Sequence, residues 1–157
     1  MTASSRIVEL GPGTGAFTGE VIEQLPQGAK FLAVDIDPTF CRQLKHEWPD
    51  LDCACASAAD LPELIAARGW THVDHVVSGL PFASLPGEVS RAILDAVHAT
   101  LKPGGTFTTF QYIHAYQLPP AKAFRHEMTR RIGPMAHRRQ VFRNVPPAFV
   151  LSWRQRD

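Results

Sequence analysis

The chain has 157 residues, the length of one domain, and 45% of them are apolar, which excludes collagen-like, coiled-coil and disordered proteins. The formal net charge is only +1, yet residues 1–100 hold 6 Lys and Arg against 13 Asp and Glu, whereas residues 101–157 hold 10 against 2. The basic last third indicates either contact with an anionic partner, such as a membrane, a phosphate or nucleic acid, or neutralisation of the two regions within the fold.

The first half of the chain alternates between strand-like and helix-like segments. Apolar residues recur every four positions at Phe17, Val21 and Leu25, which is the spacing of an amphipathic helix, and Pro26 ends that pattern. An unbroken apolar run at residues 31–34 predicts a strand buried on both faces. In chain order we expect strands at residues 7–10, 31–34 and 51–56, and helices at residues 17–25, 38–48 and 61–67.

The second half continues the alternation and ends in two successive strands. We expect strands at residues 73–78, 106–112, 135–143 and 148–153, and helices at residues 89–101 and 124–132. The turn between the last two strands leaves no room for a helix, so these strands must be antiparallel. The whole pattern predicts an α/β fold in a single domain, residues 1–157, whose seven-stranded, mostly parallel sheet has one antiparallel strand near an edge and helices on both faces.

A glycine-rich segment lies where the first strand ends and the first helix begins. Its members are Gly11, Pro12, Gly13, Thr14 and Gly15. Glycines let the backbone approach a ligand closely, and a helix N-terminus offers free N–H groups. The second strand ends in Asp35, about 20 residues on, where a carboxylate can accept hydrogen bonds from both ribose hydroxyls. This combination is typical of a site for an adenine nucleoside.

The same segment also fits the dinucleotide pattern, so the loop alone does not choose between a nicotinamide cofactor and S-adenosylmethionine. Glu9, two residues before the first glycine, would crowd a pyrophosphate but suits the cationic amino group of a methionine. The chain also ends in a hairpin, with no second nucleotide-binding half. These features favour S-adenosylmethionine as the ligand of the loop. The alternatives are a dinucleotide ligand and a loop that has lost the ability to bind a ligand.

At these residues the chain resembles the class I S-adenosylmethionine-dependent methyltransferases. Residues 8–15 are similar to motif I of that class, Asp35 to its acidic motif II residue, and residues 101–105 to the turn before its fifth strand. The resemblance covers nearly the whole chain. It implies a Rossmann-like fold, S-adenosylmethionine as methyl donor with S-adenosylhomocysteine as product, and no metal. The implied cofactor contacts are Glu9, Gly11, Gly13, Thr14, Gly15, Asp35, Ile36, Ser57, Ala58 and Ser78.

Three segments narrow the resemblance to the bacterial phospholipid N-methyltransferases of the Rhodobacter/Agrobacterium type. These are residues 77–82 after the fourth strand, residues 110–112, and residues 143–148 in the last hairpin. The resemblance implies methylation of phosphatidylethanolamine, or of its partly methylated forms, towards phosphatidylcholine. The implied substrate contacts are Gly79, Leu80, Pro81, Phe82, Arg143 and Asn144.

The nearest neighbours of that family are the rRNA adenine N6-dimethyltransferases, which carry an Asn-Leu-Pro-Tyr-like motif at the same loop. Here Ser78 stands in place of the Asn and Phe82 in place of the Tyr, which disfavours an adenine substrate. Methylation of RNA adenine is for this reason not the main prediction, but it stays as the first alternative function. Motif I begins within ten residues of the chain start, so we expect the family's preceding helix, which caps the cofactor, to be absent. The second alternative is accordingly a cofactor-binding module that is inactive without such a segment.

The chemistry requires a neutral acceptor amine, because an ammonium, which titrates at about pH 10 in water, has no lone pair for the methyl group. Candidates to take its proton are Tyr112, at the end of the fifth strand, and His114, two residues on. The Ser78 hydroxyl can orient the amine, and Phe82 can offer a ring face to a methylated ammonium. Each of these residues also has a purely structural interpretation. His114 would then be an ordinary loop histidine, Tyr112 a core aromatic residue, and residues 78–82 a plain turn.

The expected partners are an anionic membrane surface and its phospholipid, and not nucleic acid. The arginines of the last third either hold phosphate headgroups or form a solvated basic face. They are Arg125, Arg130, Arg131, Arg138, Arg139 and Arg143. Three cysteines with no framework spacing indicate a reducing compartment. We therefore expect a cytoplasmic protein, peripheral to the inner membrane.

Overall fold

The structure, a computed structural model, describes residues 1–2, 4–141 and 146–157. The first half of the chain forms β1 (Arg6–Leu10), α1 (Thr18–Glu23), β2 (Lys30–Asp35), α2 (Pro38–Glu47), β3 (Asp52–Cys55), η1 (Ala58–Asp60) and α3 (Leu61–Ala66). The second half forms β4 (Val73–Ser78), α4 (Gly87–Thr100), β5 (Leu101–Tyr112), η2 (Ile113–Ala115), α5 (Pro119–Arg131), β6 (Met135–Val141) and β7 (Ala148–Arg154).

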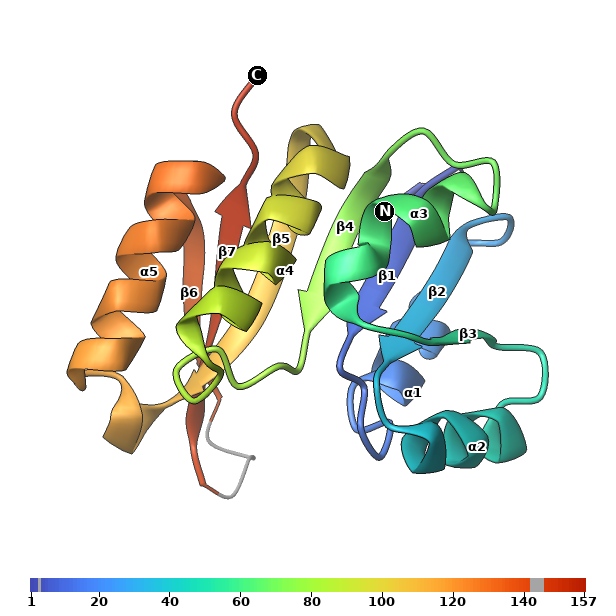
Figure 1. Cartoon of the computed structure of the whole chain (residues 1–157), viewed down its shortest axis with the longest axis horizontal. Helices are drawn as coiled ribbons and strands as arrows, with labels where there is room; N and C mark the ends of the chain where they lie inside the picture. The colour runs from blue at the N-terminus through green and yellow to red at the C-terminus, as the bar shows by residue number, and fades with distance from the viewer. Residues whose placement is uncertain (3, 142–145) are drawn as a thin grey trace.

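The strands form one sheet in the order β3-β2-β1-β4-β5-β7-β6 (Figure 1). Strands β1 to β5 pair in parallel, and β7 lies antiparallel between β5 and β6. The predicted seven-stranded, mostly parallel sheet with one reversed strand near an edge is confirmed. The chain runs outward from β1 to β3 and then returns to β4. The strand order therefore reverses between β1 and β4, where sheets of this kind bind ligands at their carboxyl ends.

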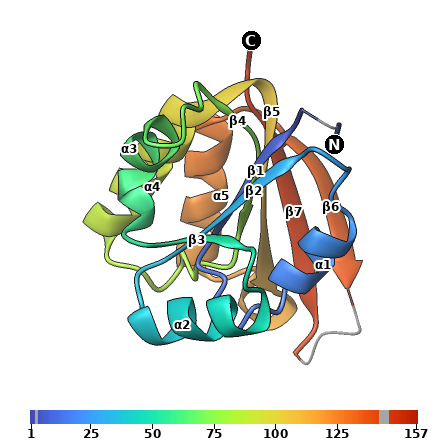
Figure 2. The ribbon, with the colours of Figure 1, turned by 90° about the vertical axis from the view of Figure 1, so that its right-hand side faces the viewer.

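Helices cover both faces of the sheet, as predicted (Figure 2). On one face α3, α4 and α5 enclose a core that includes the fully buried Val76, Phe107 and Trp153. On the other face α1 and α2 enclose a smaller core around Ile7 and Leu44. The apolar run of β2 contributes to both cores, which explains why nearly every residue of that strand is buried.

Several element boundaries differ from the expected ones. Helix α1 ends at Glu23 and not at Leu25, because Pro26 disfavours the helical conformation of the residue before it. Strand β5 begins at Leu101, which pairs with Val73, so the turn expected at residues 102–105 bulges out of a strand that has already started. Helix α5 begins at Pro119, five residues before the first apolar residue of its predicted pattern. The 3-10 turns η1 and η2 were not expected.

Candidate active site

Two cavities open at the carboxyl edge of the sheet, on either side of the loop that follows β4. The first has a volume of about 350 Å³ and lies among the loops after β1, β2 and β3; we call it the glycine-loop cavity. The second has a volume of about 340 Å³ and lies between the β4 loop, the end of β5 and the start of α5; we call it the aromatic cavity. Gly79, Leu80 and Pro81 line both cavities, so the two share one wall.

The floor of the glycine-loop cavity is backbone. Gly13 has a φ of +56°, in the left-handed region that favours glycine, and no atom lies within 4 Å of the point where its Cβ would stand. The Asp35 carboxylate lies beside it and accepts from the N–H of Gly13 at 3.0 Å and from the N–H of Asp37 at 2.9 Å. A carboxylate has about four lone-pair sites, so Asp35 keeps the capacity to accept from two ribose hydroxyls.

Glycines also bring the two cavities together. The N–H of Gly79 donates to the carbonyl of Leu10 at 2.9 Å, so the β4 loop lies directly on the end of β1. A Cβ on Gly79 would stand 2.5 Å from the carbonyl oxygen of Gly11, and a Cβ on Gly11 would collide with the Leu80 side chain. Glycine at these two positions therefore lets the loop after β4, which both cavities share, lie directly on the glycine loop.

Six of the predicted cofactor contacts line the glycine-loop cavity. They are Gly11, Gly13, Asp35, Ile36, Ser57 and Ala58. Ile36 is 73% exposed, which is unusual for so large an apolar side chain and marks it as the rim of the cavity. The Ser57 hydroxyl accepts from the N–H of Ala59 at 3.2 Å and thereby also starts η1.

The other predicted cofactor contacts do not line this cavity. Thr14 is exposed, and Ser78 lies beneath the β4 loop with a side chain that is 1% exposed. A Cβ on Gly15 would stand 2.7 Å from the Trp48 ring, so this glycine allows the loop to pack against the end of α2.

The sequence did not point to six apolar residues that line the cavity: Val34, Phe40, Ala56, Leu85, Val89 and Ile93. Phe40 belongs to α2, and Val89 and Ile93 belong to α4, so their helical spacing predicted core positions only. Val89 is 43% exposed, which a core residue would not be. Together these side chains give the cavity apolar walls that suit a flat ring.

Glu9 lies beneath the glycine loop and is fully buried. One carboxylate oxygen accepts from the Thr18 hydroxyl at 2.7 Å, and the other, Oε1, has no hydrogen-bond partner among the described residues. Burial raises the pKa of Glu9 to about 7, against the lowering effect of the Thr18 hydrogen bond. A buried carboxylate with an unpartnered oxygen is the electrostatic setting in which a cationic amino group is stabilised, which fits the role predicted for this residue.

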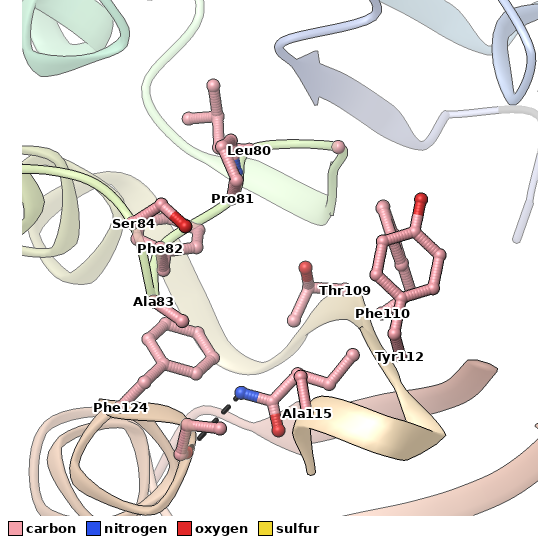
Figure 3. A pocket seen from close by; sticks show the side chains of 13 residues that line it. Leu80, Pro81, Phe82, Ala83, Ser84, Thr109, Phe110, Tyr112, Ala115 and Phe124 are labelled. Carbon is pink, nitrogen blue, oxygen red and sulfur yellow. Dashed lines mark hydrogen bonds between the residues drawn. The ribbon is translucent and has the colours of Figure 1, made fainter. Parts of the chain in front are cut away.

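Aromatic side chains surround the second cavity (Figure 3). Phe110 and Tyr112 lie on one side of it, opposite Phe82 and Phe124. The rings of Phe82 and Phe124 are stacked with centroids 4.7 Å apart, which holds the β4 loop against α5. The substrate contacts predicted at residues 79–82 all line this cavity. Sequence reasoning missed the wall that α5 and β5 provide, chiefly Thr109, Gln111, Ala121 and Phe124.

The three predicted catalytic residues lie in different settings. Tyr112 lines the aromatic cavity and is 39% exposed. His114, on η2, does not line it; its ring stacks on Tyr112 with centroids 5.6 Å apart. The Ser78 hydroxyl accepts from the N–H of Leu80 at 3.2 Å, and the Ser78 carbonyl accepts from the Thr109 hydroxyl at 2.9 Å. The side-chain and backbone oxygens of Ser78 therefore hold the loop after β4 in place through these two hydrogen bonds.

Arg143 and Asn144, the other predicted substrate contacts, lie outside the described residues. Within residues 1–2, 4–141 and 146–157, no three His, Cys, Asp or Glu side chains gather in the way that a metal site needs. The same part of the chain contains no helix that is long and apolar enough to cross a membrane.

The raised pKa of Glu9 predicts a pH dependence of stability. Between about pH 4.5 and pH 7 the folded protein keeps a proton that the unfolded chain releases, so the free energy of unfolding falls as the pH rises. Glu9→Gln cannot ionise, and we expect it to be about 1–3 kcal/mol more stable than the wild type at pH 8 but not at pH 5. Urea unfolding at both pH values measures this, with Glu20→Gln on the exposed side of α1 as the control. A pH profile unchanged by Glu9→Gln would contradict the burial of an ionisable Glu9.

Comparison with known proteins agrees with this geometry. An ornithine lipid N-methyltransferase of Singulisphaera acidiphila is 30% identical over 145 residues, which cover 90% of this chain and 71% of that protein. A ribosomal RNA small subunit methyltransferase A of Chlamydia caviae is 35% identical over 80 residues, but these cover 51% of this chain and only 27% of that protein. The crystal structure of the N-methyltransferase NodS from Bradyrhizobium japonicum WM9 covers 98% of this chain and 86% of its own, with a TM-score of 0.71 and 14% identity, and it shows a shared fold.

A family model described as a methyltransferase domain matches residues 7–105, from β1 to the turn within β5. This match includes the glycine loop, Asp35 and the β4 loop, which form the glycine-loop cavity and the wall that it shares with the aromatic cavity. The chain therefore belongs to the methyltransferase domain family, within the Rossmann-like class I methyltransferases that depend on S-adenosylmethionine.

Proposed function

We propose that this protein transfers a methyl group from S-adenosylmethionine to the amine of a membrane lipid headgroup. Phosphatidylethanolamine is the acceptor that the resemblance in sequence predicts, and the relative named as an ornithine lipid N-methyltransferase supports a lipid amine in general. The observation that carries the proposal is the shared wall: the glycine-loop cavity and an apolar, aromatic cavity meet across Gly79, Leu80 and Pro81.

The glycine-loop cavity has the residues that the cofactor needs. S-adenosylmethionine supplies a methyl group already activated by its sulfonium sulfur, so the protein has to position the reactants and exclude water. Asp35 binds the ribose hydroxyls, and Glu9 stabilises the charge of the amino group from beneath the loop. Ile36 and Val89 flank the space for the adenine ring.

The aromatic cavity prepares the acceptor. Its apolar walls disfavour an ammonium ion and so lower the pKa of a bound amine towards the neutral, nucleophilic form. Tyr112 lines this cavity, its hydroxyl can accept a hydrogen bond from the amine, and His114 supports the Tyr112 ring by stacking. Ring faces of Phe110 and Phe82 favour the methylated ammonium that forms as product.

The carboxyl edge also has the surface that a membrane-bound substrate requires. Ile36, Val89, Tyr112 and Leu118 are large apolar or aromatic side chains exposed along this edge, by 73%, 43%, 39% and 53%. Four cations of α5 and β6 form no ion pair with a carboxylate among the described residues: Lys122, Arg125, Arg138 and Arg139. Apolar side chains flanked by free cations are the combination that binds the surface of an anionic bilayer.

Methylation of rRNA adenine is the second candidate, and the relative named as a ribosomal RNA small subunit methyltransferase favours it. Ser78 argues against it, because this residue has no carboxamide to pair with an adenine edge. Its hydroxyl is also already bonded to the N–H of Leu80.

A labelled-methyl assay that offers liposomes and rRNA in parallel separates these functions. We expect label in the lipid fraction when the liposomes contain phosphatidylethanolamine or ornithine lipid, and none in rRNA. Asp35→Ala should weaken binding of S-adenosylhomocysteine by about 1.5–3 kcal/mol, the scale of lost hydrogen bonds to a charged group, and should lower transfer accordingly. Label in rRNA adenine and never in lipid would show that the acceptor is wrong.

The variant Tyr112→Phe tests whether the Tyr112 hydroxyl assists the acceptor amine. The variant keeps the ring that stacks on His114 and removes only the hydroxyl. We expect kcat to fall about 100-fold, the usual scale of proton-transfer assistance, while affinity for S-adenosylhomocysteine stays unchanged. A fully active Tyr112→Phe would remove this hydroxyl from the mechanism.

Vesicle sedimentation tests the membrane surface. We expect stronger binding to vesicles with anionic lipid than to neutral vesicles, because each cation near the surface contributes about 1 kcal/mol. The excess should disappear at high salt, which screens these charges. Equal binding to both kinds of vesicle at every salt concentration would refute an electrostatic contribution.

A further inference from the structure

Two arginines share one aromatic ring beside the aromatic cavity. The guanidinium carbon of Arg125, on α5, lies 3.7 Å from the centroid of the Tyr116 ring, and that of Arg138, on β6, lies 5.8 Å from it. Phe149 of β7 completes the cluster, with its ring centroid 4.6 Å from that of Tyr116 and 5.2 Å from the Arg138 guanidinium carbon. We call these four residues the arginine–tyrosine cluster.

The two guanidinium groups have positive charge without a matching negative one. Neither forms an ion pair with any carboxylate in the described part of the chain. By contrast, Arg130 and Arg131, which lie on α5 with Arg125, both pair with Glu127. Two like charges near one ring repel each other, and an anion bound to both relieves the repulsion. Arg125 lies over the Tyr116 ring, and Arg138 Nη1 donates to the Tyr116 hydroxyl at 3.5 Å, so one tyrosine holds both guanidinium groups. Guanidinium groups that are held in place favour binding of an oxyanion by paired hydrogen bonds.

Arg125 also has donors to spare. Its Nη1 donates to the Gln111 side-chain oxygen at 2.7 Å and to the Tyr116 carbonyl at 2.8 Å. No hydrogen bond from Nε or Nη2 occurs within the described residues, which leaves one edge of the guanidinium free. That edge presents two parallel N–H groups, the arrangement that matches a phosphate or a carboxylate.

The cluster is connected directly to the aromatic cavity. Gln111 and Ala121 line that cavity, and the Gln111 amide nitrogen donates to the Ala121 carbonyl at 3.3 Å. The other end of the same Gln111 side chain accepts from Arg125. The Gln111 side chain therefore links the wall of the cavity to the Arg125 guanidinium group.

From this arrangement we infer that Arg125 and Arg138 form the anion subsite of the lipid acceptor and bind the oxyanion of a zwitterionic headgroup whose amine occupies the aromatic cavity. The inference rests on the proposed function, since it concerns the same substrate. Phosphate and carboxylate headgroups share this chemistry, because both place an oxyanion a few bonds from a primary amine. The subsite would make the enzyme specific for zwitterionic amine lipids over amphiphilic amines without an anion.

Transfer assays in neutral detergent micelles test this specificity, since such micelles remove the general attraction of an anionic surface. The substrates are phosphatidylethanolamine and a long-chain primary amine that has no anion. For Arg138→Gln we expect KM to rise about 10- to 100-fold for the zwitterionic lipid, and to stay unchanged for the simple amine. Arg125→Lys, which keeps the charge but loses the paired donors, should show the same selectivity.

Arg42→Gln is the control, because Arg42 is an exposed arginine of α2 that has no contact with the Tyr116 ring among those described. We expect it to leave both KM values unchanged. An equal rise for both substrates with Arg138→Gln, or the same effect from Arg42→Gln, would overturn the anion subsite.

A binding measurement separates failure of the subsite from failure of the proposed function. Calorimetry on the protein saturated with S-adenosylhomocysteine uses glycerophosphoethanolamine, ethanolamine, inorganic phosphate and an rRNA fragment as probes. We expect glycerophosphoethanolamine to bind about 10- to 100-fold more weakly to Arg138→Gln, with ethanolamine unaffected. This result supports the subsite even if no lipid is methylated. Arginine-dependent binding of inorganic phosphate alone, or of the rRNA fragment alone, would overturn the headgroup assignment.

Discussion

The close approach of the β1 and β4 loops is the constraint on which the site depends. β1 and β4 are adjacent parallel strands, and the N–H of Gly79 donates to the carbonyl of Leu10 where the two strands end. The absence of a side chain at Gly79 lets the two backbones touch, and the absence of one at Gly11 leaves room for the Leu80 side chain. The two cavities are therefore separated by a single loop. Methyl transfer requires the acceptor nitrogen about 3 Å from the methyl carbon, so the two ligands have to meet beyond the edge of this loop and not through it.

The uneven charge of the sequence is only partly neutralised within the fold. Lys102 pairs with Asp74, and Arg131 pairs with Asp95, so two of the basic residues of the last third reach acids of the first hundred. The cations of the arginine–tyrosine cluster stay unpaired within the described residues. Neutralisation within the fold thus applies to some of these residues, and contact with an anionic partner stays a prediction for the others. The unpaired cations lie next to the aromatic cavity, where the proposed substrate brings its own anion.

Much of the fold could be predicted from the sequence because its signals are local. The apolar run of β2 depends on neighbouring residues alone. The start of α2 is equally local, because the Asp37 side chain accepts from the N–H of Thr39 at 2.7 Å. The glycine loop and Asp35 were recognisable for the same reason. What local signals could not supply is a contact between distant elements. In the sequence, Gln111 is indistinguishable from any other strand residue. Its hydrogen bond with Arg125 exists only because α5 packs on β5.

The same distinction explains the residues whose settings differ from the expected ones. Gly15 and Ser78 both belong to recognisable loops, yet Gly15 accommodates Trp48 and Ser78 supports the β4 loop from beneath. A motif identifies a loop, but which of its residues face the ligand depends on what packs behind them. The helical spacing of Val89 predicts burial, whereas its position at the first turn of α4 leaves it exposed at the rim of the cavity.

A crystal structure of the complex with S-adenosylhomocysteine and glycerophosphoethanolamine tests the central claim most directly. The account predicts the ribose on Asp35, the cofactor sulfur beside Gly79 and Leu80, and the amine beside Tyr112, with its nitrogen facing the sulfur directly so that a methyl group can lie between the two atoms. A sulfur atom turned away from the aromatic cavity, or an amine bound anywhere else, would contradict the claim that the two cavities hold the two halves of one methyl transfer.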